Sequence, residues 1–216
     1  MKVVKFGGSS LASATQLEKV FNIVKEDETR KYVVVSAPGK RNPEDTKVTD
    51  ALIKYYKEYT NGKDTSQSQE WIINRYRSIT EELDLDEKII EEISRDIKSL
   101  ATLPKSDNTF LYDTFLAAGE NNNAKLIAAY FVKKGLDAKY IHPKNAGIFV
   151  TSEPCNARIL PSSYDKIEEL INHNEILVIP GFFGIKYVHS REEDLTLQDP
   201  LSQPELKQIS TRTLRT

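Results

Sequence analysis

The chain begins with an apolar run that ends in a glycine pair, and a segment of helical periodicity follows it. Residues 1–10 read MKVVKFGGSS, and residues 14–26 place their apolar side chains at helical spacing. This order predicts a strand, a glycine turn and a helix. Residues 31–38, KYVVVSAP, form a second apolar run without alternation, which is typical of a parallel strand covered on both faces.

The middle of the chain has the periodicity of helices. Residues 46–59 predict one helix, and a polar stretch follows at residues 61–69. Two amphipathic segments, 70–83 and 86–100, then predict a helical hairpin at about residues 64–103 that is attached to the sheet domain.

Alternation of helices and strands resumes in the second half. Residues 108–136 predict two helices broken near Gly119, and Gly135 is expected to stop the second as a C-terminal cap. Residues 137–143 and 174–184 predict two more strands. Four strands that alternate with helices favour a layered α/β/α domain with a mostly parallel sheet.

The composition changes after Ile185. Residues 186–216 are rich in Gln, Ser, Thr, Glu and Arg and have neither helical nor strand periodicity. We therefore expect a folded unit at residues 1–185 and a disordered tail at residues 186–216.

Composition narrows the class of protein. Of 216 residues, 29% are charged, but the net charge is only -2, which lacks the basic excess of a nucleic-acid-binding protein. No apolar run reaches the roughly 20 residues that span a bilayer, and no signal-peptide pattern is present. The single Cys155 excludes an internal disulfide. These features predict a cytoplasmic protein that binds neither nucleic acid nor membrane.

Several side chains that often carry chemistry have no suitable neighbours in the sequence. His142, His173 and His189 lack partners at metal-ligand spacing, and Cys155 lacks an activating base. We assign these four residues to structure, predict no metal ligand, and expect the aromatic pair at 182–183 to belong to the core.

The glycine pair after the first strand is a candidate phosphate cradle. Lys5, Gly7, Gly8 and Ser9 could present backbone N–H groups and one positive charge to an anion. The spacing is neither that of a Walker A loop nor that of a dinucleotide fingerprint. Taken alone, this motif is more often a plain turn between a strand and a helix.

The order of motifs along the chain resembles that of aspartate kinases. KFGGSS, VVVSAPGK, KVTDALI, AAGENNNAKLIAAYF and VIPGFFG occur in that order between residues 1 and 185. The resemblance implies the amino-acid kinase (carbamate kinase-like) fold, a three-layer α/β/α sandwich that would be incomplete here at its C-terminus. In that family the first half of the kinase domain mainly holds the amino acid, and the second half mainly holds the nucleotide.

The resemblance also implies roles for individual residues. Lys5 would be the catalytic lysine that neutralises the transferring phosphoryl group of ATP, and Gly7, Gly8 and Ser9 would contact the phosphates. A carboxylate acceptor is already ionised, so the reaction needs no general base and depends on positioning and charge stabilisation. Mg²⁺ is expected only because it accompanies ATP in such reactions.

Three further residues are expected to bind the substrate L-aspartate. By the resemblance, Thr49 contacts it, Glu120 pairs with its α-ammonium, and Ser36 lines the same pocket. Local sequence alone leaves other interpretations open. Thr49 could cap a helix, Glu120 could be an exposed acid in a first helical turn, and Lys5 could be a solvated residue of an edge strand.

The tail departs from the family. Aspartate kinases follow the GFFG strand with a segment of the SRGGSDITG type, whereas this chain reads GFFGIKYVHSREEDLTLQDP. Permitted codons for residues 187–215 allow a shifted frame to read CTFSRGGSDITGSIIAAGVKADLYENFT. We therefore hypothesise that bases were lost or gained near the codons of Ile185 and Lys186.

The sequence is thus identified as part of an ATP-dependent aspartate kinase, which forms 4-phospho-L-aspartate on the route to lysine, threonine and methionine. As written, the chain is expected to be truncated and inactive, although the intact family member is expected to be a homo-oligomer. Two alternatives stay open. One is another acyl-phosphate-forming amino-acid kinase, and the other is a non-catalytic product.

Overall fold

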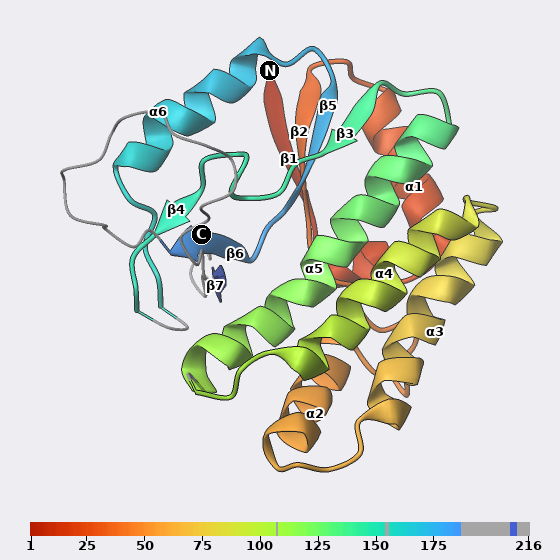
Figure 1. Cartoon of the computed structure of the whole chain (residues 1–216). Coiled ribbons are helices and arrows are strands. Elements are labelled where there is room, and N and C mark those ends of the chain that lie inside the picture. The colour runs from red at the N-terminus through yellow and green to blue at the C-terminus, as the bar shows by residue number, and fades with distance from the viewer. Residues whose placement is uncertain (107, 154–155, 187–207, 211–216) are drawn as a thin grey trace.

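A four-stranded parallel sheet forms the centre of the computed structural model, which describes residues 1–106, 108–153, 156–186 and 208–210. The strands are β1 (Lys2–Phe6), β2 (Arg30–Val35), β3 (Ala138–Tyr140) and β5 (Ile176–Pro180), in the spatial order β1-β2-β5-β3 (Figure 1). All three pairings are parallel. The predicted parallel sheet is therefore confirmed.

Both faces of the sheet bear helices, as Figure 1 shows. On one face, Val178 of β5 joins a large core with α1 (Ala14–Lys25) and α5 (Asn108–Lys133). On the other face, Leu177 packs with Leu170 of the short η3 turn (Glu169–Asn172), which follows α6 (Ser162–Glu168). Neighbouring residues of β5 thus pack against helical segments on opposite faces of the sheet. The sheet is the middle of three layers, so the predicted α/β/α fold is confirmed.

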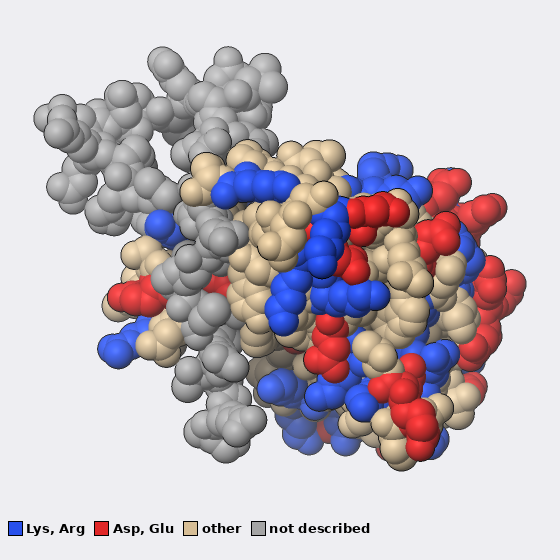
Figure 2. Space-filling view, turned by 90° about the horizontal axis from the view of Figure 1, so that it is seen from below, with Lys and Arg blue, Asp and Glu red and all other residues tan. Residues whose placement is uncertain are grey.

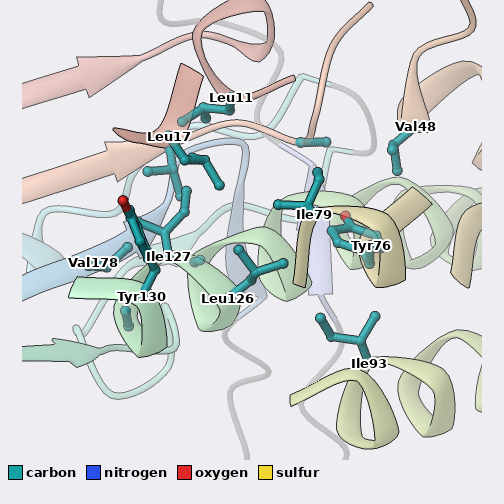
Figure 3. Packing of buried hydrophobic residues seen from close by; sticks show 14 of the residues in the cluster. Leu11, Leu17, Val48, Tyr76, Ile79, Ile93, Leu126, Ile127, Tyr130 and Val178 are labelled. Atoms are coloured by element: carbon teal, nitrogen blue, oxygen red, sulfur yellow. The ribbon is translucent and has the colours of Figure 1, made fainter. Parts of the chain in front are cut away.

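Three helices extend the core beyond the sheet. They are α2 (Val48–Thr60), α3 (Ser66–Glu82) and α4 (Glu87–Ser99), which continues into the η2 turn (Leu100–Thr102). Figure 3 shows Leu126 of α5 in the middle of this core, between Val178 on the sheet side and Ile93 of α4. The buried side chains of α5 thus join the helical region to the sheet.

The prediction of two helices broken near Gly119 is wrong, because α5 is continuous through that residue. A Cβ atom at Gly119 would lie 2.9 Å from Leu52 Cδ1 and 3.0 Å from Ala37 Cβ. The glycine therefore permits close packing of α5 against α2 and the turn after β2, and does not end the helix. The predicted cap at Gly135 is confirmed by a φ of 87° and by the hydrogen bond from its N–H to the Val132 carbonyl.

We expect Gly119→Ala to destabilise the protein although alanine is the better helix former. The propensity gain of about 1 kcal/mol opposes an overpacking cost of about 1–3 kcal/mol, so urea denaturation should give a net loss of about 1 kcal/mol. The same substitution in a Leu52→Val background, which lacks the clashing Cδ1 atom, should recover part of that loss. A stabilised single variant would contradict this account of Gly119.

The predicted strand at residues 174–184 is in fact two strands. It divides at Gly181 into β5 and β6 (Phe183–Lys186), and β6 belongs to a second sheet with β4 (Phe149–Val150) and β7 (Gln208–Ser210). Gly181 N–H still donates to the Val35 carbonyl at 3.0 Å. The backbone amides of Gly181 and Phe182, at this break, also interact with the Glu120 side chain of the site described below.

The predicted tail begins at Lys186, which the structure places at the end of β6, and residues 208–210 form β7. The rest of the tail, residues 187–207 and 211–216, lies outside the described residues, as do Cys155 and His189. Within the part of the chain that the structure describes, none of the helices combines the length and apolar character needed to cross a bilayer.

Candidate active site

A pocket of about 470 Å³ lies where the carboxyl ends of three parallel strands meet. The turn after β1 contributes Gly8 and Ser9, which begin the short η1 turn (Gly8–Leu11). The turn after β2 contributes Ser36 to Lys40, and the break after β5 contributes Phe182. Ligands of open α/β sheets commonly bind at this edge. The remaining lining residues are Lys47, Thr49, Leu116 and Glu120.

Two glycine turns touch each other at the base of the pocket. Gly39 N–H donates to the Gly8 carbonyl at 2.8 Å. A Cβ atom at Gly39 would lie only 2.5 Å from the Gly8 carbonyl carbon, and one at Gly8 would lie 3.0 Å from the Ala37 carbonyl oxygen. Both positions therefore require glycine for close backbone approach. Gly8 was predicted as a site residue and Gly39 was not, although Gly39 follows the apolar run at residues 31–38 much as the first glycine pair follows its strand.

Glu120 places a buried carboxylate against this pocket. The residue is 8% exposed and lies in the middle of α5, so the alternative of an exposed acid in a first helical turn is wrong. Burial raises its pKa to about 8. Hydrogen bonding by the Gly181 and Phe182 amides, the charge of Lys5 and the Ser36 hydroxyl all oppose this rise in pKa.

The Glu120 carboxylate is incompletely satisfied. Among the described residues its Oε2 atom has no hydrogen-bond partner. A buried acceptor without a partner is costly, and such groups in native structures commonly serve a ligand. The oxygen is therefore suited to a cationic or hydrogen-bond-donating group bound in the pocket.

The backbone of Ser36 is held in place by two hydrogen bonds. Its N–H donates to the Phe6 carbonyl at 3.2 Å, and its carbonyl accepts a hydrogen bond of 2.6 Å from Asn123 Nδ2. Asn123 is fully buried, three residues after Glu120 on α5. It was missed by the sequence analysis, although helical spacing from Glu120 places it on the same face.

Thr49 lies in the first turn of α2 and lines the pocket. The cap position of this helix is Lys47, and no side chain makes a capping hydrogen bond there. The alternative that Thr49 caps the helix is therefore wrong. The Val48 N–H donates to the Pro38 carbonyl at 3.1 Å, which ties the start of α2 to the turn after β2.

Lys5 and Gly7 are not among the residues that line the pocket. Lys5 is exposed near the end of β1, an edge strand of the sheet, so its interpretation as a solvated edge residue stays open. Its positive charge nevertheless helps to lower the pKa of Glu120. Gly7 is exposed and directly precedes the η1 turn.

Two lysines and one aromatic ring that line the pocket were not among the predicted site residues. Lys40 and Lys47 add positive charge to the same lining as Glu120, and Phe182 adds an apolar surface. Phe183 is buried as predicted, so only the first ring of the pair departs from the expected core position. On the face drawn in Figure 2 basic and acidic side chains are interspersed, in keeping with the net charge of only -2.

Among the described residues, no three His, Cys, Asp or Glu side chains gather closely enough to hold a metal ion. His142 packs its ring against Phe183 with a centroid separation of 5.8 Å and accepts a hydrogen bond from the Lys144 amide at 3.2 Å. His173 lies 3.4 Å from the Glu175 carboxylate.

The chain is similar in sequence to known kinases. Residues 1–193 match the amino acid kinase family. Aspartokinase 3 of Bacillus subtilis is 52% identical over 184 residues, which cover 85% of this chain and 40% of that protein. The chloroplastic aspartokinase 2 of Arabidopsis thaliana is 27% identical over 195 residues, which cover 84% of this chain and 35% of that protein.

Solved structures share the fold. The aspartate kinase of Clostridium acetobutylicum matches with a TM-score of 0.68 and 31% identity, over 88% of this chain and 42% of that chain. Aspartokinase III of E. coli in complex with aspartate and ADP matches with a TM-score of 0.66 and 19% identity, over 85% of this chain and 41% of that chain. The chain thus spans about 40% of the length of the first of these relatives.

Proposed function

Because the chain belongs to the amino acid kinase family, we propose that it supplies the amino-acid-binding part of an aspartate kinase. The observation that carries this proposal is the buried Glu120 carboxylate, which lacks a partner at Oε2 and faces a pocket built from glycine turns. The 52% identity to a Bacillus subtilis aspartokinase supports aspartate as the substrate. So does the E. coli relative, whose structure contains aspartate and ADP.

In this proposal Glu120 binds the α-ammonium of L-aspartate. A cation beside the carboxylate would satisfy Oε2 and lower the raised pKa of Glu120. The hydroxyls of Thr49 and Ser36, which line the same pocket, would orient the rest of the amino acid. The side-chain carboxylate of the substrate would then point toward the turn after β1.

The turn after β1 would hold the phosphates of ATP. Backbone amides of Gly7 and Gly8 and the Ser9 hydroxyl would donate to phosphate oxygens, and Lys5 would neutralise the charge of the transferring group. A substrate carboxylate oxygen forms a bond to the γ-phosphorus while the bond from that phosphorus to the bridging oxygen of ADP breaks. The products are an acyl phosphate, 4-phospho-L-aspartate, and ADP.

Mg²⁺, bound together with ATP, would supply positive charge that neutralises the phosphates. Among the described residues no group of three or more acidic, histidine or cysteine side chains could hold the ion by itself, so the ATP phosphates would be its main ligands. We further propose a cytoplasmic location and a homo-oligomeric state for the complete enzyme.

Calorimetric titration of the purified chain tests the substrate. L-aspartate should bind at least about tenfold more tightly than L-glutamate, because one extra methylene in a fitted pocket commonly costs that much. Equal affinity for the two amino acids would favour another acyl-phosphate-forming kinase of this family. Failure to bind either would favour a non-catalytic product.

Turnover is best tested in a chimera. Residues 1–185 would replace the matching segment of the Bacillus subtilis relative, and hydroxylamine would trap any acyl phosphate as a hydroxamate. We expect the chimera to be active with L-aspartate and the isolated chain to have little or no activity. A folded chimera without activity, alongside an active parent enzyme, would contradict the assignment.

A further inference from the structure

The loop between β2 and α2 forms one wall of the pocket, and a residue of α3 holds it from behind. This loop, residues 38–47, contributes Gly39, Lys40 and Lys47 to the pocket. The Arg75 side chain on α3 is only 2% exposed, which is unusual for a guanidinium. Its position therefore requires an explanation.

Both ends of the loop are bound by this one guanidinium. Arg75 Nη2 donates to the Gly39 carbonyl at 2.6 Å, and Nη1 lies 2.8 Å from Asp45 Oδ2. The Asp45 side chain is 7% exposed and also pairs with Arg41 at 2.9 Å. The two contacts span most of the loop, so Arg75 fixes its conformation and not just one end of it.

Gly39 also connects Arg75 to the turn after β1. While its carbonyl accepts from Arg75, the Gly39 N–H donates to the Gly8 carbonyl at 2.8 Å. The carbonyl and the N–H of Gly39 are thus each held by a hydrogen bond. A shift of the Arg75 contact would therefore displace the Gly39 amide from Gly8, which lines the pocket.

From these contacts we infer that Arg75, together with Asp45, is a positioning pair that holds the pocket wall in its binding geometry. The identity of the ligand rests on the proposed function. The effect of Arg75 on the conformation of the loop does not depend on it. Arg75 touches no residue proposed to react. Its Nε has no hydrogen-bond partner among the described residues, so the buried charge is compensated only by the loop.

Arginine is required because its planar fork reaches two acceptors at once. The variant Arg75→Lys keeps one positive charge for Asp45 but should lose the Gly39 contact. A second variant, Asp45→Asn, keeps the shape of the side chain at position 45 and removes its negative charge. The matched control is Arg77→Lys, because Arg77 lies on the same helix, is exposed and donates a hydrogen bond to the Asn74 side chain.

The experiment has two readouts on the full chain at a temperature where all variants are folded. NMR hydrogen exchange should show the Gly39 amide exchanging roughly tenfold faster in Arg75→Lys, while amides in the middle of α3 keep their rates. Calorimetry should show L-aspartate binding weakened by roughly tenfold. Asp45→Asn should change both readouts in the same direction, and Arg77→Lys neither.

Either readout can overturn the inference. Unchanged Gly39 exchange in Arg75→Lys contradicts the positioning role, whether or not binding changes. Faster exchange with unaltered L-aspartate affinity shows that the wall does not control binding. If the wild-type chain binds no L-aspartate, the proposed substrate fails, but the exchange comparison still decides whether Arg75 positions the loop.

Discussion

Glu120→Gln should weaken L-aspartate binding by at least about 100-fold, because the amide keeps the shape of the carboxylate and loses its charge. The buried Oε2 would no longer pair with an ammonium group. Calorimetry at pH 8 measures the effect, and Glu91→Gln, a change of an exposed glutamate on α4, is the matched control. An affinity within threefold of wild type, a difference of only about 0.6 kcal/mol, would show that Glu120 does not bind the ligand cation.

The same substitution should make the protein more stable at alkaline pH. Burial raises the pKa of Glu120 from 4.5 to about 8, so between these values the folded state retains a proton that the unfolded state has lost. Stability therefore falls as the pH rises through this window. From pH 6 to pH 9 the wild-type free energy of unfolding should fall by roughly 3 kcal/mol more than that of Glu120→Gln.

Urea denaturation of both proteins at the two pH values measures this difference. Parallel pH profiles would contradict the raised pKa. Together the two results would identify Glu120 as a residue whose burial costs stability and serves binding, which is common at functional sites.

Gly39→Ala should both destabilise the protein and disrupt the pocket. The new Cβ would lie 2.5 Å from the carbonyl carbon of Gly8, which is backbone and cannot rotate away. We expect a loss of about 3 kcal/mol in the free energy of unfolding and no measurable binding of L-aspartate.

Gly7→Ala is the matched control for stability. A Cβ at Gly7 meets no atom within 4 Å, and its φ of -81° suits alanine. Its free energy of unfolding should stay within about 0.5 kcal/mol of wild type. If Gly39→Ala were equally stable, the close contact between the two turns would not exist in solution.

The strands of the central sheet could be predicted from sequence because continuous apolar runs such as residues 31–35 have few alternative structures. The break at Gly119 was predicted wrongly because a glycine within a helix looks the same in sequence whether it ends the helix or admits a neighbour. Only the packing of Leu52 and Ala37 distinguishes these cases.

The candidate site, like the fold, could be predicted from the sequence only in part. The order of motifs predicted Gly8, Ser36, Thr49 and Glu120 as site residues, and the structure places all four around one pocket. Local pattern could not indicate Arg75, because it lies in a helix remote in sequence from the loop that it binds. Its burial depends on tertiary contacts that no short window of sequence contains.

The strand order has a consequence for how the protein folds. Tyr32 of β2 pairs with Leu177 of β5, so the pairing must wait until nearly the whole described chain has been synthesised. Such distant parallel pairings raise the contact order and slow folding. Phe182, which follows β5, is the last part of the pocket to leave the ribosome, so the nascent chain holds an open, apolar sheet edge until that moment.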